Sequence, residues 1–194
     1  MAYTSEILDK YLELHASAED PLLAALSRET YLKMQMPQMV SGHVQGLFLE
    51  MISRMVRPRR ILEIGTFTGY STICLAKGLT ADGIIYTLDI NEELEPFFTP
   101  YFIRSGLSEK IKFISGSGLD TIPGIREEFD LVFIDADKMN YANYYDLVID
   151  KVKSGGYILS DNVLWSGKVM EDKKDRETQS IHDFNNKLKN DHRV

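Results

Sequence analysis

The most regular feature of the chain is an alternation of short apolar runs with amphipathic stretches, which begins near residue 60. Aliphatic and aromatic runs bounded by glycine or charge predict buried strands. They fall at residues 61–64, 84–88, 111–114, 131–134 and 157–159. The stretches between them carry apolar residues at helical spacing. Strands that alternate with helices predict right-handed crossovers and a parallel, doubly wound α/β sheet of the Rossmann-like class.

The segment before residue 59 is predicted to be helical. Asp20 and Pro21 form a helix start, with the acid as N-cap and the proline in the first turn. A later helix ends at Pro58 and carries apolar residues on one face, at Val44, Leu47, Phe48, Met51, Ile52 and Met55. A helix over 92–105 is expected to be interrupted at its two prolines. We expect a single domain over 1–194, with a helical segment at 1–58 and an α/β core at 59–194.

Two of the predicted strands run directly into acidic residues. Residues 131–134 lead to Asp135, and residues 157–160 lead to Asp161 and Asn162, 26 positions later. Open α/β sheets bind ligands at the carboxyl ends of their strands, so these side chains are expected at one edge. Two carboxylates and an amide supply hard oxygen ligands, which favour Mg²⁺, Mn²⁺ or Ca²⁺ over zinc.

A glycine-bounded turn, between Gly65 and Gly69, follows the first predicted strand. Phe67 and Tyr70 stand where the dinucleotide pattern G-x-G-x-x-G requires glycine, so a pyrophosphate would meet side chains in place of bare backbone. Asp89 ends the second strand, where an acid can bind ribose hydroxyls. The turn therefore suits an adenosine without phosphates, and S-adenosylmethionine is the candidate ligand.

Composition narrows the class of partners. With 22 basic and 29 acidic residues the net charge is −7, which weakly disfavours a nucleic-acid or anionic membrane surface. The single cysteine, Cys74, excludes an intrachain disulfide framework and fits a reducing, cytoplasmic location. The sequence shows neither a signal peptide nor a run of ~20 apolar residues, so no membrane association is expected.

Three motifs taken together resemble the cation-dependent O-methyltransferases, a family that includes caffeoyl-CoA and catechol O-methyltransferases and small bacterial relatives. They are residues 63–71 (EIGTFTGYS), 133–141 (FIDADKMNY) and 161–167 (DNVLWSG). The resemblance implies a class I methyltransferase fold, a homodimer, and methyl transfer from S-adenosylmethionine to a small phenolic molecule with vicinal hydroxyls. Relatives usually continue through two antiparallel strands at the sheet edge, and we expect those strands to be missing here.

Carried over by position, the resemblance implies roles for individual residues. The metal ligands would be Asp135, Asp161 and Asn162, and Lys138 would be the general base. The residues that line the cofactor site would be Ser41, Glu63, Gly65, Thr66, Ser71, Asp89, Ser117, Gly118, Asp135, Asp137 and Tyr144. On the acceptor side would lie Met39, Trp165 and Ser166.

Several of these residues also fit an ordinary structural role. Asp161 and Asn162 favour turns, Asp137 suits a helix N-cap, Tyr144 lies on an apolar helical stripe, and Lys138 could be a solvated surface residue. Two other functions stay open. One is methylation of a hydroxylated uridine in tRNA, which the negative charge disfavours, and the other is a non-catalytic module that binds the cofactor.

Overall fold

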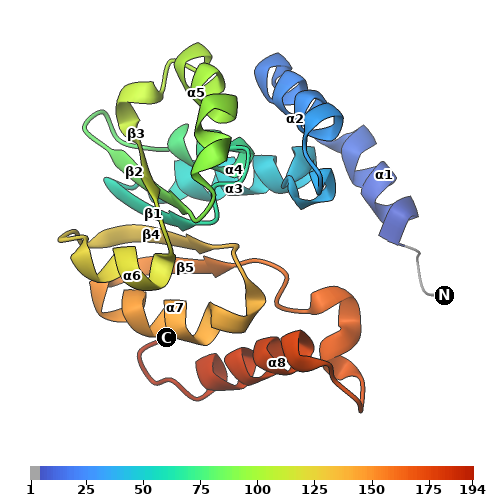
Figure 1. Cartoon of the computed structure of the whole chain (residues 1–194), viewed down its shortest axis with the longest axis vertical. Helices are drawn as coiled ribbons and strands as arrows, with labels where there is room; N and C mark the ends of the chain where they lie inside the picture. The colour runs from blue at the N-terminus through green and yellow to red at the C-terminus, as the bar shows by residue number, and fades with distance from the viewer. Residues whose placement is uncertain (1–4) are drawn as a thin grey trace.

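A computed structural model of the chain describes residues 5–194 and contains one sheet of five parallel strands (Figure 1). The strand order is β3-β2-β1-β4-β5. The strands are β1 (Arg60–Ile64), β2 (Ile84–Asp89), β3 (Ile111–Ser115), β4 (Phe129–Ile134) and β5 (Val152–Ser160). The direction of winding reverses between β1 and β4, which makes their carboxyl ends the switch point of the sheet. The predicted doubly wound α/β fold is confirmed.

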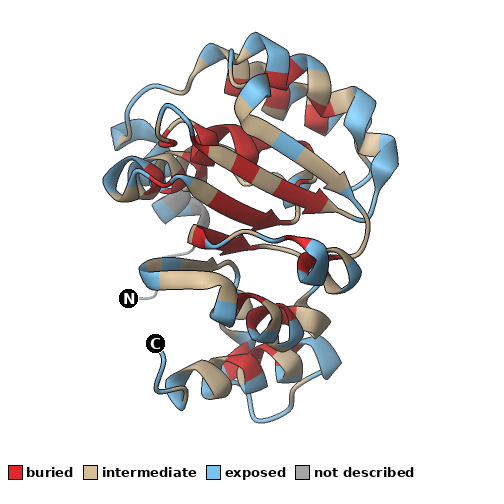
Figure 2. Ribbon diagram, turned by 90° about the vertical axis from the view of Figure 1, so that its left-hand side faces the viewer, coloured by how far each residue is buried: buried red, intermediate tan, exposed pale blue. Residues whose placement is uncertain are grey.

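Helices cover both faces of the sheet (Figures 1 and 2). One face packs against α2 (Pro21–Lys33), α3 (Gly42–Val56), α4 (Tyr70–Ala76) and α5 (Glu95–Arg104). The other packs against α6 (Gly118–Thr121), α7 (Tyr141–Val148) and α8 (Arg176–Lys189). The N-terminal helix α1 (Ser5–His15) projects beyond this body. Three of the short 3-10 turns bear on the site: η1 (Pro37–Met39), η5 (Lys138–Asn140) and η7 (Trp165–Met170).

Alternate residues of the central strands build two separate cores. In β1, Ile61 joins the core under α2–α5, whereas Leu62 and Ile64 join the core under α6–α8. In β4, Phe133 joins the core under α2–α5 and Val132 joins the core under α6–α8. This division follows from the two-residue period of a strand, whose side chains point to opposite faces in turn. Both faces are covered, so the strands read as continuous apolar runs.

The predicted helix start at Asp20 is confirmed, because its carboxylate accepts a hydrogen bond of 2.9 Å from the Leu22 amide. The expected interruption at Pro100 is not found. Helix α5 runs from Glu95 to Arg104 with Pro96 in its first turn and Pro100 inside it. Strand β5 starts at Val152, five residues before the predicted strand, and passes through two glycines.

Helix α3 packs closely against α4 through Gly46 and Ser53, and its sequence-derived apolar stripe is only partly buried. Gly46, Leu49 and Ser53 are its buried residues, and a Cβ atom at Gly46 would lie 2.5 Å from Tyr70 Cε1 of α4. The stripe identified from the sequence does share one face, but Phe48 is 52% exposed and Met55 73% exposed. Close approach of α3 to α4 therefore turns much of the apolar face outward.

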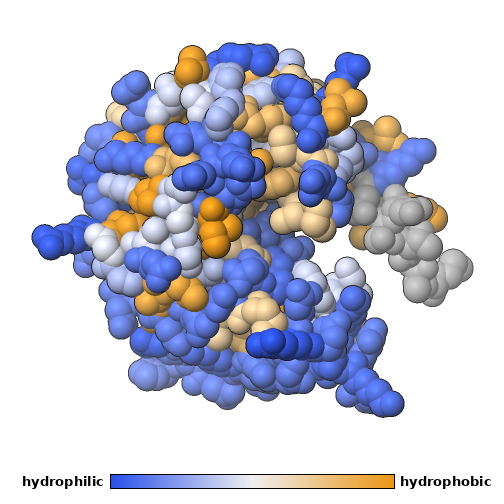
Figure 3. All heavy atoms as spheres, viewed as in Figure 1, coloured by the Kyte–Doolittle hydropathy of each residue, from blue (hydrophilic) through white to orange (hydrophobic). Residues whose placement is uncertain are grey.

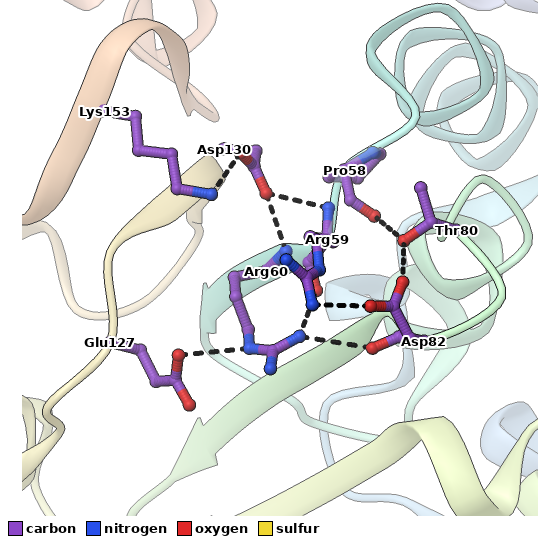
Figure 4. A network of polar contacts seen from close by, with 8 residues as sticks. All are labelled: Pro58, Arg59, Arg60, Thr80, Asp82, Glu127, Asp130 and Lys153. Carbon is purple, nitrogen blue, oxygen red and sulfur yellow. Dashed lines mark hydrogen bonds and ion pairs between the residues drawn. The ribbon is translucent and has the colours of Figure 1, made fainter.

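Ion pairs and hydrogen bonds link the strands at the amino end of the sheet (Figure 4). Asp130 of β4 accepts backbone hydrogen bonds from Arg59 and Arg60 at 2.7 and 2.8 Å and pairs with Lys153 of β5 at 2.6 Å. The Arg60 guanidinium pairs in turn with Glu127 at 3.1 Å. This network joins β1, β4 and β5 at the end opposite the acidic strand tips, so it belongs to the scaffold.

Three further expectations concern the single cysteine, membrane-spanning helices and the outer strand of the sheet. Cys74 is buried in α4, and burial raises the pKa of its thiol, which fits the predicted core role. None of the helices within residues 5–194 has the length and apolar character needed to cross a membrane. Strand β5 forms an edge of the sheet, and every strand pair within the described residues is parallel.

Candidate functional site

The candidate site lies at the switch point, where β1 and β4 run side by side. Ile64 pairs with Ile134, so the residues that follow them, Gly65 and Asp135, are neighbours. Gly65 has a φ of 108°, and a Cβ atom there would lie 1.9 Å from the carbonyl oxygen of Asp135. Glycine alone tolerates both the positive φ and this contact. The glycine turn after β1 and the acidic residue after β4 are therefore in close contact.

The tip of β5 joins the same edge. The amide of Asp161 donates a hydrogen bond of 3.0 Å to the carbonyl of Ile134, the last residue of β4. The structure thus brings Asp135 and Asp161 together, although 26 positions separate them in the chain. The outline of the molecule is indented on the side toward which β4 and β5 point, between the N-terminal helices and α8 (Figures 1 and 3).

Asp135 and Asp161 form a pair of like charges in a partly buried corner. Burial raises the pKa of Asp135, the charge of Asp161 raises it further, and the ammonium of Lys138 opposes both effects. Lys138 Nζ donates to Asp135 Oδ1 at 2.9 Å and to the Tyr141 hydroxyl at 2.5 Å. The Lys138 side chain is only 10% exposed. It is therefore not a solvated surface lysine, and its charge is directed at the acidic pair.

The turn after β5 orients the second carboxylate. Asp161 Oδ1 accepts the amide of Asn162 at 2.7 Å, and Oδ2 accepts Gln45 Nε2 of α3 at 3.1 Å. Asn162 has a φ of 56°, a conformation that asparagine tolerates better than most residues. Within residues 5–194 there is no group of three His, Cys, Asp or Glu side chains suited to a metal. The candidate set is instead two carboxylates and the exposed amide of Asn162.

Two of the cofactor candidates turn their side chains into the sheet. Glu63 is fully buried, and its Oε2 accepts hydrogen bonds from Thr72 and Thr87 at 2.5 and 2.6 Å. Burial raises the pKa of Glu63 to about 7, and these hydroxyl bonds oppose the shift. Thr66 directs its hydroxyl to Thr87 at 2.6 Å. Beside them Ser71 lies buried in the first turn of α4. A ligand on the glycine turn would therefore meet mostly backbone at residues 63–66.

Asp89, at the end of β2, is held by backbone donors. Its Oδ2 accepts the amide of Phe67 at 2.7 Å, and its Oδ1 accepts the amide of Asn91 at 2.9 Å. The first bond links the acid to the glycine turn after β1. Since carboxylate oxygens can accept more than one hydrogen bond, Asp89 can still receive a ligand hydroxyl while it braces the turn.

A second group of cofactor candidates lies between β3 and α7. Ser117 caps α6 by accepting the Leu119 amide at 3.2 Å. Gly118 is buried, and a Cβ atom there would lie 3.0 Å from Cε1 of Tyr144. The Tyr144 ring packs in the core, as its apolar stripe predicts, and its hydroxyl donates to the carboxylate of Asp137, which makes no side-chain cap hydrogen bond. The structure therefore places these four candidates in one continuous region.

The acceptor-side candidates lie on separate elements. Trp165 and Ser166 in η7 have positive φ values of 47° and 53°, and Lys138 Nζ lies 5.9 Å from the Trp165 ring centroid. Met39 is exposed in η1, and Ser41 stands at the N-cap position of α3. Within residues 5–194 neither Met39 nor Ser41 is hydrogen-bonded to the acidic pair. Among the residues predicted to contact the methyl acceptor, Trp165 is thus the one whose ring lies near the Lys138 ammonium.

Comparison with known proteins identifies the family. A family model described as O-methyltransferase matches residues 13–194. The chain is 36% identical over 173 residues to caffeoyl-CoA O-methyltransferase 1 of Nicotiana tabacum, which covers 86% of this chain and 72% of that protein. The chain belongs to the O-methyltransferase family. The predicted family and enzyme class, an S-adenosylmethionine-dependent O-methyltransferase, are confirmed.

Other relatives agree with this O-methyltransferase assignment. Caffeoyl-CoA O-methyltransferase 2 of Petunia hybrida is 39% identical over 138 residues, which cover 68% of this chain and 57% of that protein, less than two thirds of its length. Among solved structures, the O-methyltransferase TomG of Streptomyces achromogenes in complex with SAM has a TM-score of 0.89 at 27% identity and covers 98% of this chain and 88% of its own. A Bacillus cereus O-methyltransferase in complex with SAH has a TM-score of 0.88 at 29% identity, with 96% and 86% covered.

Two residues of this O-methyltransferase reach the acidic pair although sequence reasoning assigned them no role. Gln45 contacts the Asp161 carboxylate from 116 positions away, and nothing in the helical pattern of α3 marks it. Tyr141 contacts Lys138 and the carbonyl of Asp161. Its sequence signal is weak, because it also belongs to the apolar stripe of α7.

Proposed function

We propose that this O-methyltransferase transfers the methyl group of S-adenosylmethionine to a phenolic oxygen of a small molecule with vicinal hydroxyls, with the help of a divalent cation. The observation that carries the proposal is the meeting of Asp135, Asp161 and Lys138 beside the Gly65 turn. The names of the plant relatives, which act on caffeoyl-CoA, support an acceptor of this kind.

The donor set fits a hard divalent cation. Asp135 and Asp161 repel each other in a partly buried corner, so a cation held between them would relieve that repulsion. Asn162 adds an amide oxygen next to them in the chain. Oxygen ligands of this kind favour Mg²⁺, Mn²⁺ or Ca²⁺. When bound, such an ion would act as a Lewis acid and template for the vicinal oxygens and lower the phenol's pKa from about 10.

The donor is proposed to lie along the glycine turn. Asp89 would hold the ribose hydroxyls, and the region of Ser117 and Gly118 would lie near the adenine. Asp137 and Tyr144 would also approach the cofactor, with further contacts from Ser41, Ser71 and the backbone of Glu63 and Thr66. The support is spatial: Gly65 lies against Asp135, Asp89 binds the amide of Phe67, and Gly118 lies against Tyr144, near the carboxyl ends of strands, where open α/β sheets bind ligands. Phe67 leaves no bare backbone for a pyrophosphate.

The protein's own groups supply the proton transfer and the positioning. Lys138, as the neutral amine after it has released its own proton to solvent, would accept the hydroxyl proton of the acceptor, and the resulting phenolate oxygen would form the new bond to the methyl carbon. The carbon–sulfur bond breaks at the same time, and its electron pair stays on sulfur, which leaves neutral S-adenosylhomocysteine. Trp165, Met39 and Ser166 would hold the aromatic ring of the acceptor. Orientation of this kind can contribute up to ~7–11 kcal/mol to catalysis.

The test is a screen of vicinal phenols with labelled methyl donor, with and without EDTA, and with bulk tRNA in a parallel arm. We expect a catechol-like phenol to be methylated and EDTA to abolish the reaction. In Asp161→Ala, turnover should fall at least a hundredfold while calorimetric affinity for S-adenosylhomocysteine stays within a few-fold, because the carboxylate serves the acceptor side.

Asp172→Ala is the matched control, since Asp172 is an exposed acid in the loop before α8 and should leave turnover unchanged. Chelator-sensitive activity retained in Asp161→Ala would overturn the metal assignment. Methylation of tRNA without methylation of phenols would replace the proposed acceptor. Cofactor binding without any turnover would support the non-catalytic alternative.

We also propose that the enzyme forms a homodimer through the exposed stripe of α3. Val44, Phe48, Met51 and Met55 are spaced alternately four and three residues apart, which is the spacing of a seam between two packed helices. A second copy of the chain presents the same stripe, as a two-fold symmetric interface requires. Such a contact would cover Phe48, Met51 and Met55, all of which are exposed in the single chain.

A further inference from the structure

The hydroxyl group of Tyr141 occupies an unusual position for a core residue. The side chain is completely buried, and its ring packs edge-on against Phe184 with centroids 5.4 Å apart. Its oxygen nevertheless lies among polar partners at the switch point. The hydroxyl hydrogen is directed toward two carbonyl oxygens, that of Asp161 at 3.1 Å and that of Ile134 at 3.3 Å.

The two carbonyls belong to different strand tips. Ile134 ends β4 and is followed by Asp135, whereas Asp161 follows β5. One hydroxyl therefore bridges the backbone on both sides of the acidic pair. A change in the spacing of β4 and β5 at this end would lengthen one of these hydrogen bonds. The distance between the two carboxylates is thus tied to a buried and well-packed ring.

The same oxygen holds Lys138. It accepts a hydrogen bond from Lys138 Nζ at 2.5 Å, and the ammonium also lies 4.6 Å from the centroid of the Tyr141 ring. A lysine side chain has many rotamers in solution, and ordering it costs up to ~2 kcal/mol of conformational entropy. Tyr141 and Asp135 together confine the ammonium to one place, within 5.9 Å of the Trp165 ring.

We propose that Tyr141 is a positioning residue of this enzyme, whose hydroxyl sets the spacing of the two acidic strand tips and aims Lys138 at the acceptor. The inference rests on the proposed function, because it assigns Lys138 and the acidic pair their roles. It adds a residue that acts through Lys138 and Asp161 rather than on the substrate itself.

Tyr145 offers a matched comparison one turn further along α7. It is also completely buried and packs edge-on against Phe184, with centroids 6.3 Å apart. Its hydroxyl donates to Asp191 at 2.9 Å, at the end of the described chain and away from the acidic pair. Tyr141→Phe and Tyr145→Phe each remove one hydroxyl from the same core. A difference between them in catalysis therefore reports on what the hydroxyl touches and not on ring packing.

The first test compares the kinetics of the two variants on a phenol that the wild-type enzyme methylates. We expect Tyr141→Phe to lower kcat at least tenfold with the KM for S-adenosylmethionine within twofold of wild type, because the hydroxyl serves the lysine and not the donor. Tyr145→Phe should leave both parameters within twofold. Equal kcat values in the two variants would overturn the inference, as would unfolding of Tyr141→Phe alone, since the hydroxyl would then be structural.

A second test needs no activity. Trp165 is the only tryptophan in the chain, so its fluorescence reports on the ammonium beside it. We expect Tyr141→Phe to shift the emission toward that of Lys138→Met, and Tyr145→Phe to leave it unchanged. Calorimetric titration with MgCl₂ alone should show at least threefold weaker binding to Tyr141→Phe than to Tyr145→Phe. Unchanged emission and Mg²⁺ binding in Tyr141→Phe would contradict the inference.

The two proposals fail in different ways. If the wild-type enzyme methylates no vicinal phenol, the proposed function is wrong, and the emission of Trp165 still tests whether Tyr141 holds Lys138. If the wild-type enzyme is active and Tyr141→Phe behaves as Tyr145→Phe does, the function stands and only the positioning role is wrong.

Discussion

Glu63 shows at the scale of one residue how the fold changes the chemistry of a side chain. The carboxyl group is fully buried in β1, and burial raises its pKa from 4.5 to about 7. Between these values the folded protein keeps a proton that the unfolded chain has lost. The free energy of unfolding should therefore fall as the pH rises from 4.5 to 7, by about 3 kcal/mol in all, and stay at the lower level above pH 7.

Urea unfolding between pH 5 and pH 8 measures this effect. Glu63→Gln cannot ionise, so its free energy of unfolding should change less over that range than that of the wild-type protein. Glu109→Gln removes an exposed carboxylate and is the control, which should follow the wild-type profile. Parallel profiles for all three proteins would show that Glu63 titrates near its ordinary value.

The residues of the site differ in how far the sequence could reveal them. Asp135 and Asp161 were predicted to meet because each follows a strand, and strand ends gather at one edge of a parallel sheet. Gln45 could not be found in this way, because its contact with Asp161 depends on how α3 crosses the sheet. Glu63 was predicted to line the cofactor site, and the sequence did not reveal that its carboxylate accepts hydrogen bonds from Thr72 of α4 and Thr87 of β2.

At the scale of elements, the packing of α3 against α4 depends on a missing side chain. A Cβ atom at Gly46 would lie 2.5 Å from Tyr70 Cε1 and 2.9 Å from Cys74 Sγ. Gly46→Ala should improve helix propensity by about 1 kcal/mol, but overpacking a core of this kind typically costs ~1–3 kcal/mol. We therefore expect a net loss of stability and a lower Tm in thermal unfolding.

Gly124→Ala is the matched control for that variant. Gly124 has open space around its Cα atom and no positive φ, so alanine should leave the protein unchanged or stabilise it slightly, by up to ~1 kcal/mol. An increase in Tm for Gly46→Ala equal to that of Gly124→Ala would mean that α3 can move away from α4 at little cost.

Element boundaries were harder to predict than the elements. All five strands were expected. The predicted start of β5 is too late, because Gly155 and Gly156 interrupt the apolar run from which the strand was predicted. Helix α5 passes through Pro100, whose lost hydrogen bond is outweighed by the burial of Phe98 and Phe102 on either side. Local propensity fails at these points because tertiary burial decides the conformation.

At the scale of the whole molecule, the sheet order determines where chemistry can occur. The alternating pattern predicted parallel strands, but the position of β1 between β2 and β4 is a property of the folded chain. That order places the Gly65 turn beside Asp135. It also makes β5 the outer strand next to β4, so Asp161 follows the carboxyl end of the strand beside Asp135. Helices on both faces leave the carboxyl edge of the sheet as the open side, which is indented in Figure 3.

The state of assembly is the last property at this scale, and the stripe of α3 makes it testable. Sedimentation velocity should show a particle of twice the 22.2 kDa chain mass. Met51→Glu should shift it toward the monomer by placing a charge in the apolar seam, whereas Ile103→Glu, on the exposed face of α5, should not. A wild-type protein that sediments as a monomer at high concentration, or a dimer that survives Met51→Glu, would show that α3 is not the interface.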